Sequence, residues 1–157
     1  MKKDFAYPAK LTIAAVLADL VARLLGLPEF YWAPITALVS VQPDFRSALT
    51  QAWQQVAGTV LGVAAGALLL ETFRPNLLIF AISLMALSLI SLLLRLDRPA
   101  SRIAAVALVI VYLIPRDKNA WVIALHRFLE VTIGVVVGLL LSEFWPEKPN
   151  ADVTPKS

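Results

Sequence analysis

The chain contains long blocks of apolar residues, and these blocks constrain its fold more than any other feature. The clearest block runs from 77 to 96, where the only charged residue is Arg95. About 20 apolar residues in a helix cross the roughly 30 Å hydrocarbon layer of a bilayer. Blocks of similar length occupy 8–27, 47–73 and 121–145. Hydrophobic residues make up 59% of the chain, and mean hydropathy is +0.77, which few soluble domains approach because they must cover a surface with polar groups. We therefore predict an all-α integral membrane protein.

Two further apolar segments are short and end at proline. The segment "YWAPITALVSVQP" (31–43) ends at Pro43, and "RIAAVALVIVYLIP" (102–115) ends at Pro115. Apolar helices of this length are commonly buried or re-entrant. Both prolines fall at one offset of 72 residues, so we expect two short helices in equivalent places.

The same offset joins two glycine-containing runs, "GTVLGVAAGALLLE" (58–71) and "EVTIGVVVGLLLSE" (130–143). We predict a six-helix bundle made of two three-helix units. An odd number of helices makes the second unit enter the membrane from the opposite face, which gives a 3+3 inverted repeat. The predicted transmembrane domain covers 1–146, its units cover about 5–74 and 77–146, and a polar tail covers 147–157.

Lysine and arginine set the predicted orientation. With the N-terminus inside, nine of them lie on the cytoplasmic side: Lys2, Lys3, Lys10, Arg46, Arg95, Arg98, Arg102, Lys148 and Lys156. Four lie on the other side: Arg23, Arg74, Arg116 and Lys118. We expect a multi-pass protein of the bacterial inner membrane with both termini and the tail in the cytoplasm.

Five glycines form small-residue faces of the kind that let membrane helices approach closely. They are Gly58, Gly62, Gly66, Gly134 and Gly138. We predict a helix-packing role. The two long glycine-bearing helices can meet each other through these faces, or the faces can form a homodimer.

Asp19 and Arg23 lie four residues apart on the first predicted helix, so they can pair on one face. One hypothesis is a gate or proton-coupling site, because ionisable groups inside a bilayer are costly. The other is a local ion pair with Arg23 extending toward the interface.

Arg127 and Glu130 are the deepest charges of the segment 121–145. At 1.5 Å per residue they lie about 9 Å and 13.5 Å along the helix from Trp121. His126 lies beside them, Gln55 occupies the position equivalent to Arg127 under the repeat, and Gln42 and Tyr112 are polar groups of the short segments. We predict that these six residues line a substrate pathway. The alternative is that Arg127 and Glu130 form only an internal pair.

Other functions lack the residues that they need. The chain has no cysteine and one histidine, so we expect no metal site, and no nucleophile, phosphate-loop or paired-carboxylate motif indicates an enzyme or a cofactor. A net charge of +3 without a basic cluster does not favour nucleic-acid binding.

The segment "FYWAPITALVSVQPDFRSALTQAWQQVAGTVLGVAAGALL" (30–69) resembles the fusaric acid resistance and aromatic acid exporter superfamily. Its members show a "YWA-x-ITA" opening, a "QP" turn and an "R-x-x-GT-x-x-G" helix, and "HRFLEVTIGVVVGLLL" (126–141) resembles their second arginine–glycine helix. The family arginine before "GT" corresponds here to Gln54 or Gln55, whereas Arg127 retains the second one. The resemblance covers about 8–145 and implies a six-helix unit that moves organic anions, with related channels built as dimers.

Two hypotheses follow. The first is an inner-membrane transporter or channel for organic anions such as aromatic carboxylates, working as a homo-oligomer, with a dimer favoured. The second is a non-transporting membrane scaffold or accessory subunit whose glycine faces dock partners.

Overall fold

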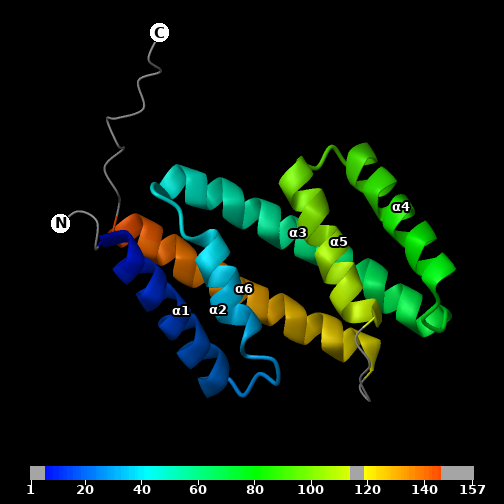
Figure 1. The fold of residues 1–157 in the computed structure, drawn as a ribbon, viewed down its shortest axis with the longest axis horizontal. Helices are drawn as coiled ribbons and strands as arrows, with labels where there is room; N and C mark the ends of the chain where they lie inside the picture. Colours follow the sequence, from blue (N-terminus) through cyan, green and yellow to red (C-terminus); the bar gives the residue numbers. More distant parts are fainter. Residues whose placement is uncertain (1–5, 114–118, 146–157) are drawn as a thin grey trace, which may run out of the picture.

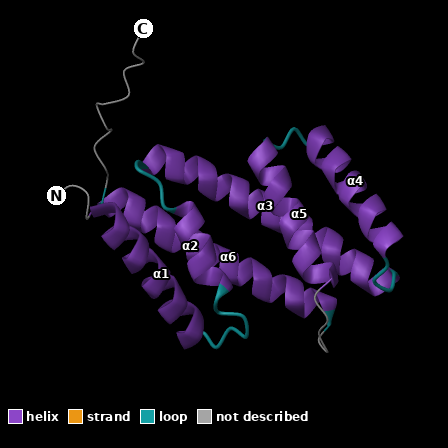
Figure 2. Cartoon of the chain, in the orientation of Figure 1, coloured by secondary structure: helices purple, strands orange, loops and turns teal. Residues whose placement is uncertain are grey.

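A computed structural model of the protein describes residues 6–113 and 119–145, and every regular element in those ranges is a helix (Figures 1 and 2). The helices are α1 (Ala6–Leu24), α2 (Trp32–Ser40), α3 (Phe45–Thr72), α4 (Leu77–Leu93), α5 (Arg98–Leu113) and α6 (Ala120–Phe144). The prediction of six helices and an all-α fold is confirmed. Pro115 and the predicted tail 147–157 lie outside the described residues.

The two longest helices, α3 and α6, pack against each other and run in opposite directions through the middle of the molecule (Figure 1). Helices α1 and α2 pack against α6 and against each other. Helix α5 packs against α3, and α4 packs mainly on α5. In the resulting bundle α1 and α2 therefore lie on α6, and α4 and α5 lie on the side of α3.

The ends of α4 and α5 differ from the sequence prediction. Arg95 adopts a left-handed conformation (φ 54°), and the amide of Leu96 returns to the carbonyl of Ser91, which ends α4 before residue 96. Helix α5 begins at Arg98, four residues earlier than expected, with Pro99 in its first turn, where a missing amide hydrogen costs nothing. Of the two helices predicted to be short, α2 has nine residues and α5 has 16.

Two described helices, α3 and α6, are long and apolar enough to cross a bilayer, and α4 is apolar but has 17 residues. Helix α1 was expected to span as well, but it carries Lys10, Asp19 and Arg23 within 19 residues. Large apolar side chains cover much of the surface, and Leu77 and Leu93 of α4 are each 81% exposed. Such a surface is stable only against other apolar groups.

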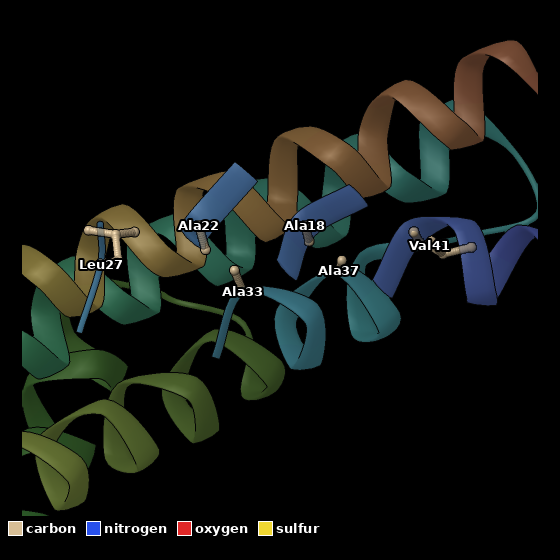
Figure 3. Packing of buried hydrophobic residues seen from close by; sticks show 7 residues of the cluster. Ala18, Ala22, Leu27, Ala33, Ala37 and Val41 are labelled. Carbon is tan, nitrogen blue, oxygen red and sulfur yellow. The ribbon is translucent and has the colours of Figure 1, made fainter. Parts of the chain in front are cut away.

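Alanines determine how closely α1 approaches its neighbours. Ala14, Ala18 and Ala22 follow one face of α1 and are completely buried against a cluster that includes Ala33 and Ala37 of α2 (Figure 3). Partly buried apolar residues of α6 pack on the same cluster: Ile133, Val137 and Leu141. Small side chains permit this close helix contact, because van der Waals packing is the main attraction between helices in an apolar surrounding.

One sequence hypothesis expected the glycine faces of α3 and α6 to pack against each other, and the structure shows that they do not. A Cβ atom on Gly62 of α3 would overlap the carbonyl oxygen of Ala104 in α5. A Cβ atom on Gly134 of α6 would lie 2.5 Å from the carbonyl oxygen of Ala33 in α2. Helix α3 therefore packs closely on α5 through its glycines, and α6 packs closely on α2. Gly58 and Gly66 also face α5, and Gly138 faces α2.

Asp44 caps α3 and gives the fold a specific dependence on pH. Its side chain accepts hydrogen bonds from the amide of Ser47 at 2.9 Å and from the Ser47 hydroxyl at 2.7 Å. These bonds, the amide bond first, hold the pKa of Asp44 below its ordinary value of 3.8. The ionised cap therefore stabilises the folded state above pH 3.8, and this stabilisation is lost as pH falls through the lowered pKa.

We expect Asp44→Asn, which keeps an acceptor but cannot ionise, to melt at a lower temperature than the wild type at pH 7. The difference should shrink as pH falls below 3.8 and disappear once pH is below the lowered pKa of the folded state, because the wild-type cap is then protonated. Thermal unfolding in detergent micelles from pH 7 down to the acidic range measures the difference in melting temperature. A difference that does not change with pH would contradict the ionised cap.

Candidate functional site

A cavity of about 220 Å³ lies where α2, α3, α5 and α6 meet. Six of its lining residues carry a polar group: Trp32, Thr36, Gln55, Thr59, Arg102 and Arg127. The other six are apolar: Ile35, Val39, Ile103, Val106, Ala107 and Val131. The cavity lining thus combines two guanidinium groups and other polar groups with apolar side chains.

Arg127 of α6 is the buried charge of this cavity, with 7% of the residue exposed. Its guanidinium carbon lies 3.9 Å from the centre of the Trp32 ring, a cation–π contact that joins α6 to α2. Its Nη1 atom lies 3.9 Å from Oε2 of the fully buried Glu130. Charge-assisted hydrogen bonds are about 2.7–2.9 Å long, so this ion pair is a loose one.

Gln55 of α3 lies on the same cavity and connects α3 to the end of α2. The Ser40 hydroxyl lies 2.5 Å from Oε1 of Gln55 and 2.8 Å from the carbonyl oxygen of Thr36, so its proton is shared between two acceptors. All three residues are buried, as is the cavity residue Thr59. This network fixes the side chain of Gln55, because a buried amide that is hydrogen-bonded is costly to displace.

The cavity brings together two of the six predicted pathway residues, Arg127 and Gln55, and Glu130 lies directly behind Arg127. The other three lie elsewhere. The backbone carbonyl of Gln42 accepts a hydrogen bond from Lys10 at 2.7 Å, and its backbone amide donates to the Ser142 hydroxyl. Gln42 does not line the cavity. The Tyr112 hydroxyl donates to the carbonyl of Arg74, in a cluster formed with α3 and α4. His126 is half-buried and does not line the cavity.

Asp19 and Arg23 form an ion pair of 2.7 Å on α1, away from this cavity. Their side chains are 32% and 56% exposed, and the Arg23 guanidinium lies over the ring of Phe30. The geometry matches the local-pair hypothesis, and the gate or proton-coupling role stays a prediction.

Sequence reasoning did not select four polar cavity residues: Trp32, Thr36, Thr59 and Arg102. Trp32 and Thr36 are four residues apart, so they share one face of α2, and that spacing is a signal that a pattern search can use. Arg102 entered only the count of charges, because nothing in its own neighbourhood indicates that α5 packs beside α6.

A larger cavity of about 540 Å³ lies between α3, α4 and α5. Its lining includes Leu68, Phe73, Ile82 and Leu87, and its only polar side chain, Ser83, donates its hydroxyl to the carbonyl of Ile79. The larger cavity therefore offers no charged group to a ligand, and the smaller one carries the chemistry.

A comparison with protein families places the site in context. Residues 13–141, which include every residue that lines the cavity, match the family described as fusaric acid resistance protein-like. The chain belongs to the fusaric acid resistance protein-like family. The family resemblance expected from the sequence is thereby confirmed.

Two relatives of the chain are named as membrane proteins. The uncharacterized membrane protein YvaC of Bacillus subtilis is 32% identical over 136 residues, which cover 83% of this chain and 21% of the relative. The inner membrane protein YeeA of Escherichia coli is 22% identical over 141 residues, covering 88% of this chain and 40% of the relative. The uncharacterized protein ORF2 of Neisseria gonorrhoeae is 32% identical over 72 residues, covering 46% of this chain and 17% of the relative. The chain thus spans less than half the length of these relatives, and no solved structure matches it.

Proposed function

We propose that this family member is a membrane-embedded unit that moves organic anions such as aromatic carboxylates. The observation that carries the proposal is a buried guanidinium, Arg127, on a cavity that is also lined by apolar side chains. A carboxylate needs a cation where water is scarce, and its ring needs an apolar surface. The family name, which refers to resistance to an organic acid, supports the same class of solute.

Arg127 can supply the chemistry of anion recognition in this cavity. A guanidinium presents a planar fork of donors that matches the two oxygens of a carboxylate. Trp32 stacks on the guanidinium, and the hydroxyls of Thr36 and Thr59 lie on the same lining. The apolar side chains of Ile103 and Val106 face the cavity from α5 and can receive an aromatic ring.

An inverted repeat in a bilayer is part of this proposal. Its support is that the long helix of each half packs through its glycines on the second helix of the other half. Helix α3 packs on α5, and α6 packs on α2. This is the arrangement that a pseudo-twofold axis between α3 and α6 would produce. We place the unit in the inner membrane, as YeeA is named, with both termini in the cytoplasm and with a homodimer as the working assembly.

Flux through purified protein tests the function. In proteoliposomes we expect uptake of benzoate above that of protein-free liposomes, and no such gain for benzamide, its neutral analogue of similar shape. Equal fluxes for the two compounds, or no benzoate flux beyond protein-free liposomes, would refute anion transport.

An exchange of charges separates transport from the scaffold hypothesis. In Arg127→Glu combined with Glu130→Arg the pair remains, but the guanidinium moves three residues along α6 and off the cavity lining. We expect a folded protein with at least about tenfold less benzoate flux, since carboxylate contacts to a charged group are worth about 1.5–3 kcal/mol. A scaffold would tolerate the exchange, so unchanged flux would contradict the role given to the cavity.

A further inference from the structure

The described residues at the two ends of the bundle differ in net charge. At the end where α3 and α5 begin and α4 ends, the described residues include five basic and three acidic side chains: Lys10, Arg46, Arg95, Arg98, Arg102, Asp44, Asp97 and Glu143 (Figure 1). At the opposite end the described residues include two basic and three acidic ones: Arg23, Arg74, Asp19, Glu29 and Glu71. On the charges of the described residues, the first end therefore attracts an anion more strongly than the second.

Arg102 connects that positive end to the cavity. It lies one turn into α5, it is exposed, and it lines the same cavity as the buried Arg127. Among the described residues no carboxylate lies within ion-pair distance of its guanidinium, in contrast to Arg23, which is paired with Asp19. Arg98, one turn earlier on the same helix, is also exposed but does not line the cavity.

We propose that Arg102 is the entrance guanidinium of the anion site, and that the site is loaded from the end where α3 and α5 begin. This inference rests on the proposed function and adds a direction of loading to it. An exposed cation captures a carboxylate from water, and the buried Arg127 then holds it. The apolar side chains of Ile103 and Val106 line the same cavity as the two arginines and give an aromatic ring a surface to contact.

The physical signature of such a residue is kinetic. A charge at the mouth of a cleft raises the rate of association, by about tenfold or more at low salt, and salt screens the effect within a Debye length of about 10 Å at 0.1 M. The rate of dissociation depends instead on the contacts made inside, here those of Arg127. Substitution of Arg102 should therefore change association and leave dissociation nearly unchanged.

Stopped-flow binding of benzoate to the purified full chain in micelles tests this. Trp32 lines the cavity and the other three tryptophans do not, so Trp32→Phe identifies the fluorescence signal. We expect Arg102→Gln to slow benzoate association about three- to tenfold at low salt, with dissociation within about twofold and most of the salt dependence lost. Arg102→Lys should retain fast association, and Arg98→Gln, with the same loss of charge but no place on the cavity lining, should slow association much less than Arg102→Gln.

The direction of loading is tested in vesicles. The chain has no cysteine, so a single Leu94→Cys at the exposed end of α4 marks by labelling which membrane face holds the positive end. We expect Arg102→Gln to raise the KM for benzoate supplied at that face only. An equal effect of Arg98→Gln, an effect confined to dissociation, or equal KM changes at both faces would overturn the inference. A wild-type protein that binds no benzoate would refute the proposed function itself.

Discussion

Replacement of Arg127 by glutamine is expected to abolish most benzoate binding and flux. The variant removes the one buried guanidinium of the cavity, and loss of one partner of a buried charged contact costs about 2–5 kcal/mol. At 1.4 kcal/mol per tenfold, benzoate should bind at least about 30-fold more weakly. Equilibrium titration of Trp32 fluorescence and flux in proteoliposomes measure the two effects.

Folding must be separated from binding in this variant. Arg127→Gln also removes a cation 3.9 Å from the buried Glu130, and removing one partner of a buried ion pair costs about 3–5 kcal/mol of folding free energy. The double variant Arg127→Gln with Glu130→Gln removes both charges, so we expect it to recover most of the lost stability and none of the binding. Recovery of benzoate binding in the double variant would show that Arg127 does not hold the anion.

Arg23→Gln is the matched control for the loss of one positive charge. Arg23 is exposed, pairs with Asp19 on the surface of α1 and does not line the cavity. Exposed pairs contribute about 0–1 kcal/mol, so binding and stability should stay close to those of the wild type. A loss of flux with intact binding would instead support the predicted gate role of Asp19 and Arg23.

The second large effect is expected at Gly62, where α3 contacts α5. A methyl group there would overlap the carbonyl oxygen of Ala104 and lie 2.7 Å from Cβ of Ala107, and neither group can rotate away. Overpacking costs about 1–3 kcal/mol or more, whereas alanine favours a helix over glycine by about 1 kcal/mol. We therefore expect Gly62→Ala to lower the free energy of unfolding by about 2 kcal/mol in a denaturant titration in micelles.

Gly66→Ala is the internal comparison on the same helix. Its Cβ atom would lie 2.9 Å from Cβ of Val111 and 3.3 Å from the carbonyl oxygen of Leu108, so the contact is less severe than at Gly62. We expect a smaller loss of stability, because a small shift of one side chain relieves most of it. If Gly62→Ala proved no less stable than Gly66→Ala, the close α3–α5 contact would be wrong.

The substitution at Gly62 would also affect the cavity, through the position of α5. Helix α5 carries the cavity residues Arg102, Ile103 and Val106, so displacement of α5 from α3 would move these residues together. The glycines of α3 thus act on function through the position of α5, although no glycine lines the cavity.

The sequence by itself determined the helices and their approximate order. Apolar blocks, prolines and the 72-residue offset are local or periodic features, and they predicted six helices, a short α2 and the depth of Arg127 and Glu130. The sequence also carried the family resemblance, because its motifs are contiguous stretches of residues.

Only the tertiary structure decided which faces meet. Glycine faces favour close packing with any helix, so the sequence could not distinguish an α3–α6 contact from the observed contacts with α5 and α2. Tyr112 and Gln42 were placed in the pathway by their position on short helices, yet their hydrogen bonds to Arg74 and with Lys10 lie outside the cavity. Trp32, Thr36, Thr59 and Arg102 join Arg127 and Gln55 only because four helices converge, and such long-range contacts leave no periodic mark in the chain.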